Sequence, residues 1–253
     1  LLFIIFYLKL HKKLSVYIKR FIPSKVETKR LKKILYLGLP SALHSFFEVA
    51  FFISAVWMSG FIGKNSQAAN QIALNLASMT YMVALGVGVA AMIRVGNQMG
   101  TMNFKKLRDV ALSTILLIIF IDIVFCLIFL LFNDYLPLLY LDANNPLNLT
   151  DVNQVLDIAS KLLIIAGVFQ LFDGIQAVVL GALRGMQDVN KPAVIIFLSY
   201  GVIGFPISYY LGFYTSLSMV GIWLGLLSGL FSSSLFLFLR FNYLSRKIIR
   251  LND

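Results

Sequence analysis

Long uninterrupted apolar segments constrain the fold of this chain more than any other feature of its sequence. Six of them are long enough to cross a membrane as a helix, because a hydrocarbon core of about 30 Å needs about 20 residues at 1.5 Å each. They lie at about 34–63, 67–96, 110–132, 154–183, 193–213 and 218–240. Continuous apolar runs indicate helices, whereas the strands of a barrel alternate. We therefore expect an all-α integral membrane protein with a six-helix transmembrane bundle.

Composition supports a membrane protein and suggests how the chain is divided. The chain is 59% hydrophobic and 13% charged, which is too apolar for an ordinary soluble domain. Residues 1–8 resemble the end of a further transmembrane helix, and the chain begins at Leu. We expect a basic cytoplasmic loop at 9–33, a six-helix lobe at 34–240 and a cytoplasmic tail at 241–253. The same features predict a fragment of a longer polypeptide.

Basic residues gather on one side of the predicted helices. If successive loops alternate sides, twenty of the 22 Lys and Arg residues fall on one side, ten of them between Lys9 and Lys33. Lys64 is alone on the opposite side, and Lys161 lies within a helix. Because basic loops stay in the cytoplasm, we expect a cytoplasmic C-terminus. This asymmetry accounts for the net charge of +11, so we expect membrane lipid and no nucleic acid as a partner.

Three carboxylates interrupt the apolar segments: Glu48 and Asp122 lie midway along theirs, and Asp173 lies in the inner half of 154–183. An ionised group at the centre of a membrane helix costs about 2.5–3.5 kcal/mol on insertion scales. Asp122 stands between isoleucines with no polar stripe, and we interpret it as a packing residue. Glu48 shares a helix face with His44, which on its own is more typical of a packing histidine.

Asp173 has polar and small neighbours on its helix. Gln170 and Gln176 lie within a turn of it, and three glycines recur every seven residues, Gly167, Gly174 and Gly181. Glycines at this spacing allow close helix approach, so Asp173 should face protein or a cavity. The segment at 67–96 adds a further polar stripe of Gln71, Asn75, Ser78 and Met82 with Tyr81 beside it.

These groups suggest an ion-dependent switch. Two carboxylates that face one cavity of low dielectric constant cannot both ionise cheaply. A proton or a hard cation such as Na⁺, which prefers oxygen ligands, would compensate the charge and change helix packing. Pro40 and Pro206 permit bending within the membrane, although a static kink is as common. The alternative for each carboxyl is a hydrogen-bonded group that joins helices.

The residues reached so far resemble the multidrug and toxic compound extrusion (MATE) family, specifically its NorM-like branch. The resemblance covers nearly the whole chain. It rests on four motifs in order: Leu39-Pro40-Ser41 with Phe46-Phe47-Glu48-Val49, Asn70-Gln71-Ile72-Ala73-Leu74-Asn75, Ile93-Arg94-Val95-Gly96, and Phe172-Asp173-Gly174-Ile175-Gln176 leading into Gly181-Ala182-Leu183-Arg184-Gly185.

The resemblance implies the C-terminal lobe of a twelve-helix transporter in the bacterial inner membrane, with the N-terminal lobe of the same polypeptide missing. It implies export of drug-like, often cationic compounds in exchange for Na⁺ or H⁺, with no other cofactor. Glu48 and Asp173 match the family's cation-binding acids, and so are tentative Na⁺ ligands. Tyr81 matches an aromatic position at that site. Gln71, Asn75, Gln170 and Phe169 are candidate cavity-lining residues. Phe169 stands where members can carry a tyrosine, so it lacks a hydroxyl ligand.

Two other functions remain open at this stage. A flippase for lipid-linked precursors or a polysaccharide exporter of related fold would handle anionic substrates and should line its cavity with Arg or Lys, for which Lys161 is the main candidate. An intramembrane enzyme would need a catalytic constellation, yet the chain has only His11 and His44 and none of the expected motifs. The mostly acidic charges within the membrane favour a cationic cargo.

Overall fold

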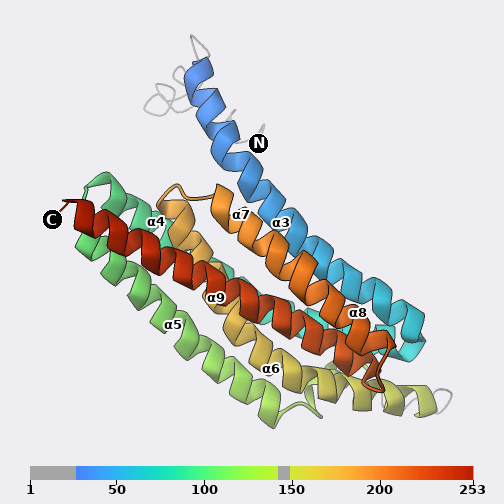
Figure 1. The fold of residues 1–253 in the computed structure, drawn as a ribbon. Helices are drawn as coiled ribbons and strands as arrows, with labels where there is room; N and C mark the ends of the chain where they lie inside the picture. The colour runs from blue at the N-terminus through green and yellow to red at the C-terminus, as the bar shows by residue number, and fades with distance from the viewer. Residues whose placement is uncertain (1–26, 142–148, 253) are drawn as a thin grey trace, which may run out of the picture. The chain divides into compact units, whose positions relative to one another are not determined.

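The fold is an assembly of long helices. This computed structural model describes residues 27–141 and 149–252. Within these ranges six helical spans are long and apolar enough to cross a membrane, which confirms the prediction of an all-α membrane fold. They are α3 (Thr28–Ile62), α4 (Lys64–Gly100), α5 (Phe104–Leu131), α6 (Leu149–Gly185), α7 (Asn190–Phe197) continued by η2 (Leu198–Gly204) and α8 (Phe205–Phe213), and α9 (Ser218–Asn252) (Figure 1). A short 3₁₀ helix, η1 (Leu136–Leu139), follows α5.

The chain divides into two compact units, Leu1–Leu39 and Pro40–Asp253. Of the first, the described residues are 27–39, which form the beginning of α3. The predicted helix end at 1–8 and most of the predicted basic loop lie outside the described residues. All residues discussed below belong to the second unit.

Several helices extend beyond the apolar segments that predicted them. Helix α9 continues to Asn252, so most of the predicted tail at 241–253 is helical, and α3 begins at Thr28 within the predicted loop. Helix α5 begins at Phe104, where the Asn103 side chain accepts a hydrogen bond from the backbone N–H of Lys106 at 3.2 Å. Hydropathy detects only the part of a helix that lipid surrounds, while Lys, Arg and Leu continue a helix well into water.

The fifth span contains a widened turn. Residues 198–204 form a π-helix, and the N–H of Phe205 donates to the carbonyl of Tyr200, five residues earlier. Pro206 follows directly. A proline has no N–H and its ring clashes with the carbonyl four residues before it, and widening the preceding turn is one way to relieve that clash. The predicted bend at Pro206 therefore takes the form of a π turn.

Helix α6 is the central element of the second unit. It packs against α4, α5 and α9, and 67% of its most apolar stretch is buried, against 22% in α5. Figure 1 shows α6 running alongside α9 and α5. A residue on α6 therefore faces protein on most sides, which explains why this helix can carry Asp173.

Glycines bring α6 into backbone contact with its neighbours, as their spacing predicted. A Cβ atom at Gly181 would overlap the backbone of Gly88 on α4, and one at Gly185 would lie 2.7 Å from the carbonyl oxygen of Met92. A Cβ at Gly174 would overlap the Asp122 carboxyl on α5. Since any side chain would force these helices apart, the glycines set the distance between α6 and α4.

Aromatic packing fixes α3 beside the fifth span. The Phe51 ring stacks on Tyr200 with centroids 4.6 Å apart. It fills space left by two glycines, because a Cβ at Gly204 or Gly229 would lie within 3 Å of the ring. Glu48 lies one turn before Phe51 on the same helix, so this contact holds the carboxylate in position.

Candidate functional site

A cavity of about 390 Å³ lies between α3, α4 and α6. Its polar wall comes from all three helices and comprises Glu48, Gln71, Asn75, Ser78, Tyr81 and Asp173. Val49, Phe52, Ile53 and Phe169 supply much of the apolar wall. Gln71, Asn75 and Ser78 are exposed, so the cavity opens on the side of α4. Such a mixture of apolar walls and a few convergent polar groups is typical of a small-molecule site.

The cavity brings together six of the seven predicted site residues. Glu48, Asp173, Tyr81, Gln71, Asn75 and Phe169 all line it. The seventh, Gln170, is not among the residues that line it. Its side chain is buried and has no hydrogen-bond partner on either polar atom. Gln170 lies three residues before Asp173, but consecutive helical positions differ by about 100°, and Phe169 occupies the position that faces the cavity.

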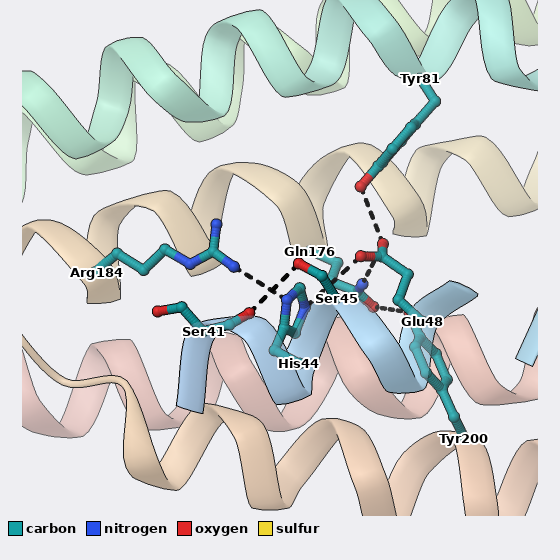
Figure 2. A network of polar contacts seen from close by, with 8 residues as sticks. All are labelled: Ser41, His44, Ser45, Glu48, Tyr81, Gln176, Arg184 and Tyr200. Carbon is teal, nitrogen blue, oxygen red and sulfur yellow. Dashed lines mark hydrogen bonds and ion pairs between the residues drawn. The ribbon is translucent and has the colours of Figure 1, made fainter. Parts of the chain in front are cut away.

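Glu48 is the most connected residue of the site (Figure 2). The Tyr81 hydroxyl donates a hydrogen bond to Glu48 Oε1 at 2.9 Å, and the Gln176 amide donates to the same oxygen at 3.5 Å. The Tyr200 hydroxyl in turn donates to Gln176 Oε1 at 2.8 Å. Because the amide oxygen of Gln176 is engaged by Tyr200, its NH₂ group is turned towards Glu48.

Asp173 lies deeper than Glu48. Its side chain is 5% exposed, and Oδ1 has no hydrogen-bond partner within the described residues. An unpaired buried carboxylate oxygen is costly, and here it borders a cavity that can admit a ligand. Phe169, 2% exposed, lies one turn away with its ring centroid 5.2 Å from that of Trp223. Asp173 and Glu48 thus offer two acceptor groups to one cavity.

His44 and Arg184 form a second polar cluster beside Glu48. Arg184 Nη2 lies 3.0 Å from His44 Nδ1, and His44 Nε2 lies 3.9 Å from Glu48 Oε2. A smaller pocket of about 280 Å³ contains His44, Arg184 and Gln176 and shares Glu48 and Tyr81 with the first cavity. Glu48 therefore separates two pockets. Sequence reasoning interpreted His44 as a packing residue, but its ring is part of this network.

Three residues of the network were missed as site residues. Arg184 was assigned only to the basic side, Gln176 only to a polar stripe, and Tyr200 was not considered. A signal existed for the first two, because Asp173, Gln176 and Arg184 lie three and eight residues apart and so share one face of α6. Nothing in the sequence around Tyr200 distinguished it from other aromatic residues of the fifth span.

Asp122 lies outside both pockets. Its side chain is 1% exposed, it fits against Gly174, and Oδ2 has no hydrogen-bond partner in the described part of the chain. This placement agrees with the interpretation of Asp122 as a packing residue. Across residues 27–141 and 149–252, no three His, Cys, Asp or Glu side chains form a metal-binding group. Any cation held here would therefore rely on two carboxylates at most, with neutral oxygen ligands completing the shell.

Six membrane-length helical spans, three of which border an acidic, partly apolar cavity, define a multi-pass membrane protein. Comparison with known proteins makes this more specific. The chain belongs to the MatE family, whose sequence model matches residues 40–210. This is a family of transporters and not of enzymes, so the intramembrane enzyme is set aside.

Bacterial relatives support the NorM-like assignment. A probable multidrug resistance protein NorM of Rhizobium meliloti (strain 1021) is 35% identical over 85% of this chain and 45% of its own length. A probable multidrug resistance protein NorM of Bacillus subtilis (strain 168) is 34% identical over 88% of this chain and 47% of its own. The chain thus spans about half the length of the curated relatives it matches.

The fold also agrees with a solved transporter. A crystal structure of MATE in the bent conformation superposes with a TM-score of 0.79 over 90% of this chain and 49% of that chain, at 19% sequence identity. At this identity the likeness concerns the fold alone. It shows that these six spans have the arrangement found in about half of a MATE transporter.

Proposed function

We propose that this chain forms one lobe of an ion-driven exporter of drug-like organic compounds, many of them cationic. The observation that carries the proposal is the cavity itself, in which Glu48 and Asp173 face apolar and aromatic walls. A carboxylate near aromatic rings attracts an organic cation by charge and by cation–π interaction. The relatives named multidrug resistance proteins support the same function.

The charge of the cavity disfavours the flippase for anionic lipid-linked precursors. Among the described residues that line the cavity, none is Lys or Arg. Lys161, the basic residue that could have supported this alternative, pairs with Asp157 at 2.7 Å on the surface of α6. Asp157 compensates the charge of Lys161 outside the cavity, so Lys161 would not bind a phosphate group within the cavity.

The two carboxylates supply the coupling. An organic cation and a Na⁺ ion or proton all compete for the negative charge of Glu48 and Asp173, because the cavity cannot hold several positive charges against only two carboxylates. Binding of the coupling ion would therefore release the drug, and ion release would restore the drug site. This mutual exclusion is a sufficient basis for antiport.

A second lobe would complete the transporter. The cavity is open, and apolar residues around it are exposed, among them Val49, Ile53 and Met82. A homologous lobe packed against this face would close the cavity. We further propose that the end of the lobe with Arg184 and the C-terminus faces the cytoplasm, since its basic residues predict that orientation.

The test is drug efflux by the assembled two-lobe transporter in everted vesicles, with ethidium as the probe and imposed Na⁺ or H⁺ gradients as alternative driving forces. We expect Glu48→Gln and Asp173→Asn each to reduce gradient-driven efflux at least tenfold, because each removes one of the two charges. The gradient that drives the parent identifies the coupling ion.

Asp122→Asn provides the matched control, since it removes a buried membrane carboxyl that does not line the cavity. It should leave efflux near the parent rate. Normal efflux by both Glu48→Gln and Asp173→Asn, at equal protein levels, would refute the proposed coupling.

A further inference from the structure

The surroundings of Glu48 differ on its two sides. Towards the larger cavity it shares space with Asp173 and the amides of α4, which offer oxygen atoms. Towards the smaller pocket it meets His44, Gln176 and, behind them, Arg184 (Figure 2). One side can hold a cation, whereas the other carries a positive charge of its own.

The contact with Arg184 fixes the proton of His44. A guanidinium group has only donors and remains charged in proteins, so His44 Nδ1 must accept the hydrogen bond at 3.0 Å. A neutral imidazole then carries its proton on Nε2. This atom has no hydrogen-bond partner in the described structure and lies 3.9 Å from Glu48 Oε2. His44 therefore presents an N–H group to the carboxylate.

Two other neighbours of Glu48 donate hydrogen bonds to it. Tyr81 and Gln176 donate to Oε1, and Tyr200 holds the Gln176 amide in that orientation. The titratable groups around Glu48 are thus His44 on its own helix, Tyr81 on α4, Asp173 and Arg184 on α6, and Tyr200 in η2. Of these, Arg184 alone brings a fixed positive charge. The hydrogen-bond donors and the positive charge of Arg184 both stabilise the Glu48 carboxylate when it holds no ion.

We propose that Arg184 and His44 act as an ion-release pair, which weakens the hold of Glu48 on the coupling ion and so promotes its release. The guanidinium repels a cation at Glu48, and His44 turns the partial positive charge of its N–H group towards Oε2, 3.9 Å away. Both are positioning residues, and the inference rests on the proposed ion-coupled export.

The experiment compares variants that remove the pair with variants that preserve it. Arg184→Gln removes the charge, and His44→Met removes both ring nitrogens at similar volume. His44→Gln keeps an acceptor for Arg184 and a donor for Glu48, and Arg184→Lys keeps the charge. In the two-lobe transporter we measure ethidium efflux against the concentration of the driving ion, together with equilibrium binding of that ion to purified protein.

We expect Arg184→Gln and His44→Met to lower the half-saturating ion concentration by about three- to tenfold, as expected for the loss of a nearby positive charge or an oriented donor. Their maximal efflux rate should fall because ion release becomes slow. His44→Gln and Arg184→Lys should stay within about twofold of the parent. A merely structural role would lower protein amount or rate without tighter ion binding.

Failure of the inference can be distinguished from failure of the proposed function. If Glu48→Gln abolishes ion-driven efflux but Arg184→Gln and His44→Met bind the ion no more tightly than the parent, the release pair is refuted and the exporter stands. If Glu48→Gln and Asp173→Asn both transport normally, the proposed ion coupling itself is refuted. Should Arg184→Gln fail to fold, the comparison of His44→Met with His44→Gln decides alone.

Discussion

At the scale of a single residue, Phe169 determines whether the cavity has a hydroxyl oxygen as a possible ligand beside Asp173. Its ring is almost fully buried against Trp223 and Phe52, yet it also lines the cavity one turn from Asp173. Two carboxylates and two side-chain amides line the cavity, but residue 169 offers it no hydroxyl group. Na⁺ binds through oxygen ligands, so under the proposed ion coupling we expect residue 169 to influence the selectivity between Na⁺ and H⁺.

Phe169→Tyr is expected to strengthen Na⁺ dependence. The added hydroxyl supplies a neutral oxygen near Asp173, and the half-saturating Na⁺ concentration for efflux should fall about threefold or more, as expected for one additional ligand of about 1 kcal/mol. The measurement is efflux by the assembled transporter in a Na⁺ series at constant pH. Phe52→Tyr, on the α3 wall of the same cavity, serves as a control for a hydroxyl placed elsewhere. Unchanged Na⁺ affinity in Phe169→Tyr would contradict the idea.

At the scale of elements, the close contact between Gly181 on α6 and Gly88 on α4 determines how tightly the two helices pack. Gly181→Ala should destabilise the lobe by about 1–3 kcal/mol, because its methyl group would overlap the Gly88 backbone. The control is Gly86→Ala on α4, where an added Cβ meets nothing within 4 Å. Thermal unfolding of the purified protein measures both. Equal midpoints for the two variants would mean that the helices separate at little cost.

The elements were largely predictable, and the site only in part. Hydropathy located all six spans, because lipid requires about 20 apolar residues whatever the tertiary contacts. It did not locate the ends of α3 or α9, whose polar turns continue beyond the apolar segments. Glu48 and Asp173 could be found because a charge in lipid is costly. The contacts of Arg184 with His44, and of Tyr200 with Gln176, depend on how separate helices pack, which no local pattern encodes.

At the scale of the whole molecule, charge predicts orientation. In the second unit the basic residues lie at the end formed by the α4–α5 and α6–α7 connections and the C-terminus, while Lys64 and Lys161 at the other end pair with Asp151 and Asp157. The excess of positive charge is therefore on one side, and the positive-inside rule predicts that this side faces the cytoplasm.

Cysteine labelling tests this orientation. Cys126 is the single cysteine, so a Cys126→Ala background leaves none. Two single cysteines would then mark opposite ends of the lobe. Met102→Cys lies in the turn between α4 and α5 and Leu139→Cys at the end of η1, and each of these residues is 76% exposed. A membrane-impermeant maleimide on intact cells should label only Leu139→Cys, and permeabilised cells should label both. Labelling of Met102→Cys alone in intact cells would reverse the topology.

The backbone contact of Gly181 with Gly88 also has a mechanical consequence. No side chain lies between the two backbones at this contact. Helix α6 could therefore tilt about it without a change of side-chain rotamer there. Asp173 lies eight residues from it, about 12 Å along the axis, whereas Arg184 lies three residues away on the other side, about 4.5 Å. These unequal lever arms mean that one tilt would swing Asp173 through roughly two to three times the displacement of Arg184. The lobe could thus reshape its cavity while Arg184, near the end of the same helix, moves by less than half as much.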